Sequence, residues 1–447
     1  MKNNIRRFLF LILLLSTNAA VLAAQQTNSS ETLALQPARP LASFIWRMQD
    51  RFGVKGKNDL LDYRWDEVRE VFDPLYVNPK SWIIDFDGCN PSVVSGSYVW
   101  EIDGQVLTET RCRFSHPFTA QGDHSVKLTV TAPTGESASF DSVVTVKDLF
   151  IVSIGDSYAS GEGNPDKPWE VVKRAKWIDS RCHRSATAGP ALAALEIEKD
   201  DPHSAVTFIS FACSGAGLKD GLTGAFKKGS ARLRPQLDQV VDAAKGRPID
   251  ALLISIGGND VNFGALVLKA IQLRHAETDV STARLVRDGL NVLQQRYADL
   301  GQRLRTMNVT KVFITEYPVI VRNQKKNPCD HSPKFPDLLN GISKAEADWA
   351  ERSVIRPLND KVREAAALWG WVYVTGIANK FSGEDPETIA HGYCAEDERW
   401  VRTFNDSWKI QGNEKGTAHP NQLGHSWYAK RLVLALQENG VIAALAP

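Results

Sequence analysis

The sequence lacks a charge imbalance of either sign. Its 447 residues include 53 Lys and Arg against 52 Asp and Glu, so the formal net charge is +1. No strong basic or acidic balance therefore steers the chain towards nucleic acid or a membrane surface. Hydrophobic residues make up 43% and charged residues 23%. These are ordinary globular values, which argue against a wholly disordered or multi-spanning membrane protein.

Several chemical motifs are also missing. The chain has no C-x-x-C pair and no cysteine–histidine cluster at zinc-binding spacing, which argues against a zinc site. It has no glycine-rich phosphate loop with its lysine and no cluster of metal-binding carboxylates. A kinase or a nuclease is therefore not supported.

A single uninterrupted apolar run stands at the start of the chain. Residues 8–15 (FLFLILLL) follow a basic start, and small residues place a cleavage site after Ala23 or Ala24. The run is shorter than the roughly 20 residues that span a bilayer, so we predict that residues 1–24 are an export signal, with an uncleaved anchor as the alternative. No later segment is apolar and long enough to span. We expect a secreted or periplasmic protein without a transmembrane segment once the signal is removed.

An oxidising compartment would pair the six cysteines. Six cysteines allow 15 connectivities, and the sequence alone does not choose among them. Nearest neighbours along the chain each fall within one expected structural unit, which favours pairing Cys89 with Cys112, Cys182 with Cys213, and Cys329 with Cys394.

The N-terminal third contains two segments of different sequence pattern. Residues 25–78 are predicted to be a polar leader followed by a partly helical segment in which aromatic residues stand among many charges. Residues 79–147 contain short alternating β-type runs, such as 97–102 and 125–131, separated by turn signals. This pattern predicts a small all-β sandwich. Around Trp100 it resembles the PKD and other immunoglobulin-like modules of exported proteins.

Residues 148–447 switch to strands that alternate with helices. The predicted strands are nearly continuous apolar runs, and they lie at 149–154, 205–211, 249–256, 310–315 and 371–374. Buried strands separated by helices predict an α/β fold with a parallel sheet covered on both faces.

Polar residues and glycines follow these strands directly. A doubly wound sheet forms its binding sites there, beyond the carboxyl ends of its strands. Ser157 follows the first strand, Gly215 the second and Asn259 the third, and His419 precedes the last helix. A serine with a histidine base is a nucleophile for acyl transfer. The backbone N–H groups of Ser157 and Gly215 and the side-chain amide of Asn259 would stabilise an oxyanion. These residues also have plainer explanations, in which Gly215 permits a turn and Asn259 caps a helix.

The same residues, in the same order, resemble the SGNH (GDSL-type) hydrolase superfamily, and most closely its secreted bacterial esterases. Gly155-Asp156-Ser157 matches the first block, Gly215 the second, Gly257-x-Asn259-Asp260 the third and His419-Pro420 the last. The resemblance covers residues 149–447. It implies a flavodoxin-like three-layer fold and hydrolysis of carboxylic esters through an acyl-enzyme on Ser157, with His419 as the general base and no metal or cofactor.

One position departs from the superfamily pattern. Its last block usually reads Asp-x-x-His, but Gly416 stands three residues before His419. A backbone carbonyl at or near Gly416 is the favoured replacement for the orienting carboxylate. Asp406 and Glu414 are the nearest acids in sequence that would serve instead.

The substrate and some alternatives stay open at this point. Lipid acyl esters, acetylated carbohydrates and small soluble esters all suit the expected site, and the β-module suits contact with carbohydrate or a cell surface. An acyltransferase would use the same residues. A non-catalytic binding or adhesion protein on the same scaffold is the alternative from another class.

Overall fold

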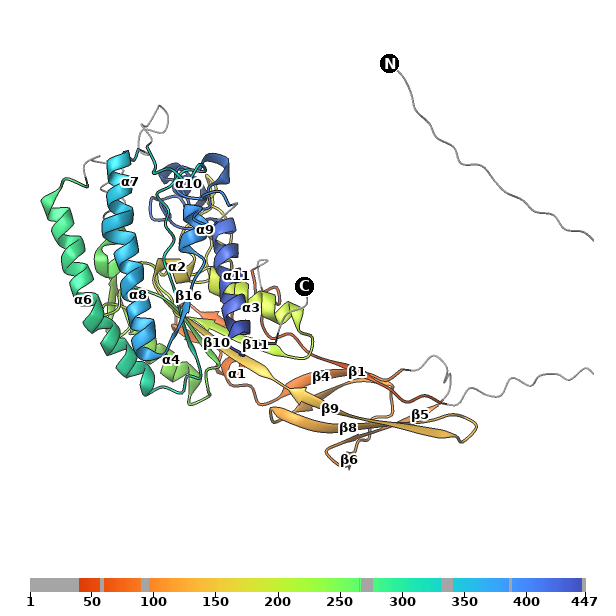
Figure 1. Cartoon of the computed structure of the whole chain (residues 1–447). Helices are drawn as coiled ribbons and strands as arrows, with labels where there is room; N and C mark the ends of the chain where they lie inside the picture. The colour runs from red at the N-terminus through yellow and green to blue at the C-terminus, as the bar shows by residue number, and fades with distance from the viewer. Residues whose placement is uncertain are drawn as a thin grey trace, which may run out of the picture.

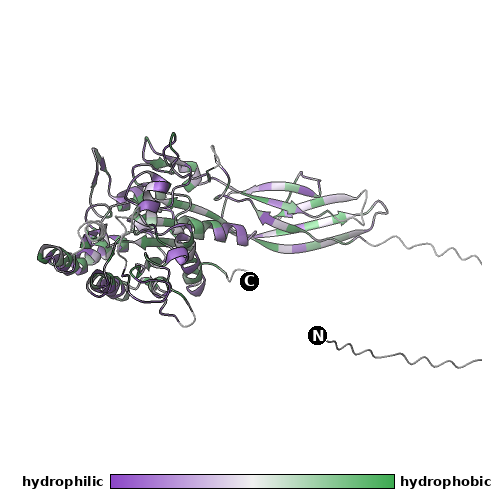
Figure 2. Cartoon of the chain, turned by 90° about the horizontal axis from the view of Figure 1, so that it is seen from above, coloured by the Kyte–Doolittle hydropathy of each residue, from purple (hydrophilic) through white to green (hydrophobic). Residues whose placement is uncertain are grey.

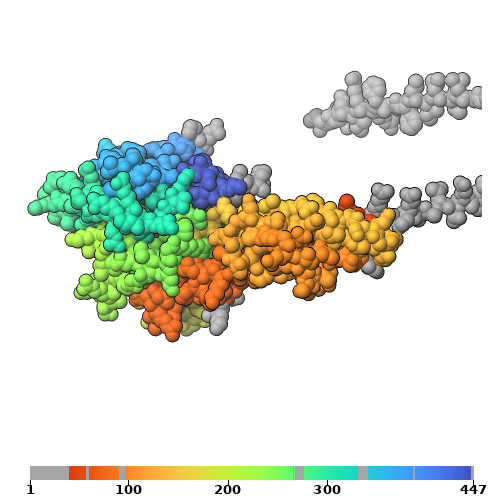
Figure 3. Space-filling view, turned by 90° about the horizontal axis from the view of Figure 1, so that it is seen from below, coloured from red at the N-terminus to blue at the C-terminus, as the bar shows by residue number. Residues whose placement is uncertain are grey.

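The computed structural model describes residues 40–56, 60–89, 96–264, 266, 276–330, 341–385 and 388–443. The predicted export signal and polar leader lie outside the described residues. Among the helices that are described, none is long and apolar enough to cross a membrane. The chain forms a helical α/β part from which an elongated β part extends to one side (Figures 1 and 3).

The β part consists of two antiparallel sheets. One sheet has the strand order β1 (Ile45–Met48), β4 (Trp82–Asp87), β7 (Arg113–Phe118). The other has the order β6 (Gln105–Val106), β5 (Ser97–Ile102), β8 (Gly122–Thr131), β9 (Ser137–Val146). Trp100 is fully buried between them beside Phe86 and Phe114. The predicted small all-β sandwich is therefore present.

The segment before residue 79 differs from its prediction. Instead of being partly helical over its length, it contains β1, two two-residue strands, β2 (Trp65–Asp66) and β3 (Val71–Phe72), and one short helix, α1 (Pro74–Val77). Strand β1 pairs with β4, so the sandwich begins before residue 79. The strand was not recognisable because its exposed face carries the apolar Ile45 as well as Arg47, so the sequence shows no clear alternation of apolar and polar residues.

The aromatic residues of this segment pack on the α/β part. Phe52 and Tyr63 both contact Phe208, at ring-centroid distances of 5.2 and 5.8 Å. Their burial explains why aromatic residues stand among so many charges in the sequence.

The α/β part confirms the predicted fold class. Five parallel strands have the spatial order β11 (Ala205–Ser210), β10 (Asp148–Gly155), β14 (Ala251–Ser255), β15 (Val312–Thr315), β16 (Val372–Val374). This 2-1-3-4-5 order is that of a flavodoxin-like doubly wound sheet. Every residue of β10 is buried, and Figure 2 shows the hydrophobic strands enclosed by the helices.

Helices cover both faces of the sheet. On one face α3 (Gly189–Asp200) packs against α11 (Gln422–Glu438). On the other lie α4 (Gln236–Ala244), α6 (Val280–Arg305) and α8 (Arg356–Trp369). Strand β11 lies on one side of β10 and β14 lies on the other. The loops after these three parallel strands therefore meet at the carboxyl edge of the sheet, where such folds bind ligands.

Candidate active site

Ser157 and His419 form a hydrogen-bonded pair at this edge. Ser157 is the first residue of α2 (Ser157–Ser160), directly after β10. His419 lies between α10 (Phe404–Gln411) and α11. The Oγ of Ser157 is 2.7 Å from the Nε2 of His419, within the range for a nucleophile and its base.

The other imidazole nitrogen contacts a backbone carbonyl. The Nδ1 of His419 is 3.0 Å from the carbonyl oxygen of Thr417. Because a carbonyl only accepts, Nδ1 carries the proton and Nε2 is left to accept one. Ala418, between the two residues, has a φ of +64°, and this turn brings the carbonyl to the ring.

The sequence favoured a carbonyl at or near Gly416, and the carbonyl beside the ring belongs to the next residue, Thr417. The carbonyl of Gly416 instead accepts the backbone N–H of His419 at 3.1 Å. Both carbonyls belong to the same turn, so the sequence alone does not distinguish them.

Neither of the two nearby acids bonds to His419 among the described contacts. The Asp406 carboxylate accepts the N–H of Thr403 at the start of α10 and lies 3.5 Å from Arg399. Glu414 lines the same cavity as His419, and its carbonyl accepts the N–H of Thr417. The usual aspartate thus has no carboxylate substitute in the described part of the site.

Burial lowers the pKa of His419 below its usual value, and the charge of His183 acts in the same direction. The Glu162 carboxylate and the Thr417 carbonyl oppose this shift. The net result favours the neutral imidazole, which is the form that accepts a proton.

The candidate oxyanion donors lie in the same cavity. Ser157, Gly215, Asn259 and His419 all line it, and with its mouth included its volume is about 810 Å³. Gly215 has a φ of +89°, and among the described residues its backbone N–H has no acceptor. The Nδ2 of Asn259 donates to the carbonyl of Ala216 at 2.9 Å, which fixes the amide and leaves its second N–H for a ligand.

Asp156 connects two of these loops. Its carboxylate caps α2 through the N–H of Tyr158 at 3.0 Å and accepts the hydroxyl of Tyr317. That hydroxyl in turn accepts the N–H of Gly258 at 2.9 Å, one residue before Asn259. Burial raises the pKa of Asp156 to about 7. The loop with Ser157 and the loop with Asn259 are therefore joined by hydrogen bonds.

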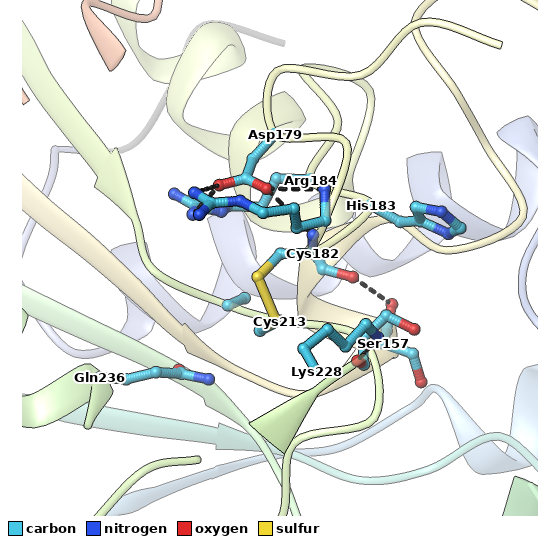
Figure 4. The surroundings of a disulfide bond; sticks show 12 residues. Ser157, Asp179, Cys182, His183, Arg184, Cys213, Lys228 and Gln236 are labelled. Carbon is cyan, nitrogen blue, oxygen red and sulfur yellow. Dashed lines mark hydrogen bonds and ion pairs between the residues drawn. A yellow bond between two sulfur atoms is a disulfide. The ribbon is translucent and has the colours of Figure 1, made fainter. Parts of the chain in front are cut away.

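A disulfide near Ser157 connects the segment between α2 and α3 to the loop after β11 (Figure 4). Cys182 is bonded to Cys213, and the carbonyl of Cys182 accepts the N–H of Ser214 at 3.0 Å. The N–H of Cys213 donates to the carbonyl of Gly155 at 3.0 Å. The two residues before Gly215 are thus held in place, Cys213 against the strand end that precedes the serine and Ser214 against Cys182.

All six cysteines are paired as nearest neighbours along the chain. The bonds are Cys89–Cys112, Cys182–Cys213 and Cys329–Cys394. Structural disulfides are typical of oxidising compartments, which fits an extracytoplasmic protein.

Sequence reasoning missed Glu162, which is fully buried behind the site. Its carboxylate accepts hydrogen bonds from His183 Nδ1 at 2.8 Å, Ser214 Oγ at 2.6 Å and Gln411 Nε2 at 2.7 Å. Burial alone would raise its pKa, but the His183 bond and charge outweigh burial and hold it at about 2. The glycines on either side have φ values of +99° and +85°. A charged residue between two glycines was the one signal in the sequence.

An apolar cavity adjoins the site. Phe263 lines both cavities, and Ala418, which is next to His419, lines the apolar one. Its other apolar walls include Leu266, Ile320, Val321, Ile342, Trp349 and Tyr393.

The family model described as "GDSL-like Lipase/Acylhydrolase family" matches residues 153–427. No curated protein matches the sequence. Among solved structures, an extracellular lipase from Streptomyces rimosus is 20% identical, with 65% of this chain and 99% of that chain covered and a TM-score of 0.44.

Two other solved structures extend over different parts of the chain. A carbohydrate esterase is 12% identical, with 89% of this chain and 98% of that chain covered and a TM-score of 0.31. The PKD1 domain of the Vibrio cholerae metalloprotease PrtV is 18% identical, with 24% of this chain and 95% of that chain covered and a TM-score of 0.15.

Proposed function

Because the chain belongs to the GDSL-like lipase/acylhydrolase family and is therefore an ester hydrolase, we propose that Ser157 is its nucleophile and His419 its general base. The 2.7 Å distance between the Ser157 Oγ and the His419 Nε2 carries this proposal. A serine hydroxyl is a weak nucleophile until a positioned base removes its proton.

The reaction proceeds in two halves. Ser157 attacks the ester carbonyl while its proton passes to His419, and the proton then leaves with the alcohol as the acyl-enzyme forms. Water then attacks this intermediate with His419 again as the base, the bond between the Ser157 Oγ and the acyl group breaks, and the proton returns from His419 to Ser157 as the carboxylic acid leaves. In both halves the oxyanion accepts hydrogen bonds from the N–H groups of Ser157 and Gly215 and from the Asn259 amide.

The Thr417 carbonyl fixes the tautomer of His419 and stabilises the imidazolium only weakly, because it carries no full charge. The buried Glu162 carboxylate supplies negative charge from a greater distance, without a hydrogen bond to the ring. We propose a Ser157–His419 dyad with this buried carboxylate as a positioning and electrostatic residue.

The apolar cavity favours a lipid acyl chain over an acetyl group as the acyl part of the substrate. Each methylene that leaves water for an apolar cavity contributes about 0.8 kcal/mol, and about 1.4 kcal/mol corresponds to a tenfold change. An acetyl group would leave the space beyond Phe263 unused.

The test is a series of p-nitrophenyl esters from acetate to palmitate. We expect kcat/KM to rise by at least about tenfold from acetate to octanoate. Ala350→Phe, which fills the apolar cavity, should lower kcat/KM for octanoate more than for acetate. Ala283→Phe on the exposed side of α6 is the matched control. A maximum at acetate, with no effect of Ala350→Phe on the profile, would favour a deacetylase.

The pH dependence of kcat/KM gives a separate prediction. The base acts only when neutral, so a lowered pKa keeps His419 active at lower pH, and the acid limb should have its midpoint below 6.5. Glu162→Gln removes a charge that raises the pKa of His419, so its limb should lie at still lower pH. Initial rates between about pH 4 and pH 8 measure the acid limb of the wild type and that of Glu162→Gln. A wild-type midpoint above 6.5 would contradict the assignment of a buried, neutral base.

A further inference from the structure

Lys228 lies on the inward-facing side of a short hairpin beside the site. The hairpin consists of β12 (Phe226–Lys228) and β13 (Ala231–Leu233). Phe226 and Lys228 lie on its inner face, where Phe226 packs on the Cys182–Cys213 disulfide cluster. Lys227, between them, is exposed. The alternation of the strand therefore directs one of two neighbouring lysines inward.

The ammonium of Lys228 lies beside the candidate oxyanion donors. Its Nζ donates to the carbonyl of Ser214, and a Cβ built on Gly215 would lie 3.6 Å from the same Nζ. Lys228 lines the cavity that contains Ser157 and Asn259. Figure 4 shows its side chain reaching towards Ser157.

Lys228 has no carboxylate of a described residue within ion-pair distance, although it is largely buried. The nearby Glu162 carboxylate is already bonded to His183, Ser214 and Gln411. An ammonium has three N–H donors, and the Ser214 carbonyl occupies one. Burial lowers the pKa of Lys228 to about 8, which the charge of Glu162 opposes, so most of it is charged at neutral pH. A buried charge with spare donors is costly unless a ligand supplies acceptors.

The cavity therefore has two chemically different walls. Beside Gly215 stands the Lys228 ammonium, and the adjacent residues Glu414 and Lys415, of opposite charge, also line this cavity. Phe263 instead lines both this cavity and the apolar cavity, which Lys228 does not line. If the acyl chain occupies the apolar cavity, as proposed above, the cavity that holds the ammonium is left for the alcohol part of the ester.

We propose that Lys228 binds an anionic group, a phosphate or a carboxylate, on the alcohol part of the ester, so that the substrate is an acyl ester of an anionic alcohol. The inference rests on the proposed function of the site. It assigns Lys228 to substrate specificity and not to the bond-making steps.

The experiment compares three octanoyl esters with a shared acyl chain: those of glycerol, glycerol 3-phosphate and glycolate. Octanoate release gives kcat and KM for each ester. A charge-assisted hydrogen bond predicts that wild type prefers an anionic ester to the neutral one by about tenfold or more, mainly through KM. The phosphate and carboxylate arms show which anion is preferred.

Lys228→Met is expected to remove this preference by raising KM for the anionic esters relative to the neutral one. Lys227→Met, one residue away on the exposed face of the hairpin, should keep it. An equal loss of kcat/KM on all three esters would mean that Lys228 stabilises the oxyanion or holds the Ser214 loop, and would overturn the proposal. So would a wild type without an anionic preference.

Two further readouts keep the outcomes separate. Hydrolysis of p-nitrophenyl octanoate reports on the proposed function itself, so its absence in wild type would contradict that function and not only the anion site. If Lys228→Met fails to fold by circular dichroism, inhibition of wild type decides the question. Glycerol 3-phosphate should compete with p-nitrophenyl octanoate at constant ionic strength, and glycerol should not; equal inhibition by both would overturn the proposal.

Discussion

Ser157→Ala is expected to reduce hydrolysis of p-nitrophenyl octanoate to the background rate, a loss of about 10⁴-fold or more in kcat. The variant lacks the oxygen that would form the acyl-enzyme. Hydrolysis would then require direct attack by water on the ester, without a covalent intermediate. The fold should persist, because the described side-chain contact of this hydroxyl is with His419 alone. Initial rates and a thermal melt of the same sample measure both effects.

Ser160→Ala provides the matched control for this loss. Ser160 lies in the same short helix and is also buried, but its hydroxyl donates to the carbonyl of Ser157 at 3.3 Å and not to His419. Its kcat should stay within a few-fold of wild type. Comparable activity in Ser157→Ala and wild type would show that another residue carries the reaction.

His419→Ala is expected to lower kcat by a similarly large factor, about 10⁴-fold. Removal of the imidazole leaves the Ser157 hydroxyl without a base, and no other histidine bonds to this hydroxyl among the described residues. Steady-state rates with p-nitrophenyl octanoate, together with a melt to check the fold, measure this effect.

Two carboxylate variants test what orients the imidazole. Asp406→Asn and Glu414→Gln should each change kcat by no more than a few-fold, because Asp406 caps α10 and the Nδ1 of His419 bonds to the Thr417 carbonyl. A hundredfold loss in either variant would mean that its carboxylate reaches His419 during turnover. The carbonyl-oriented dyad would then be wrong.

The candidate site was predictable where a residue type and its position after a strand coincide. Ser157, Gly215 and Asn259 each follow a buried strand of the parallel sheet, and the fold brings the ends of these strands together. Such placement follows from topology alone, so no side-chain detail was required.

Thr417 and Glu162 were not predictable in this way. A backbone carbonyl has no signature in sequence, and its choice over that of Gly416 depends on the positive φ of Ala418. Glu162 would ordinarily be expected at the surface, and its burial depends on three partners from distant segments, His183, Ser214 and Gln411.

The fold was likewise predictable in one part and not in another. The α/β sheet was predictable because its strands are buried on both faces and are therefore continuously apolar, as in β10. Strand β1, at an edge of the sandwich, was missed because its exposed face carries the apolar Ile45 as well as Arg47. Long-range pairing, and not local pattern, determines that strand.

The most direct test of the dyad is covalent labelling by a p-nitrophenyl alkylphosphonate, followed by intact-mass measurement and peptide mapping. A phosphonate reacts with a serine only when a base activates it. We expect one adduct per chain, located on Ser157, with its formation suppressed in His419→Ala. An adduct on another residue, or no adduct on wild type that is folded by its thermal melt, would contradict the assignment of Ser157 as the activated nucleophile.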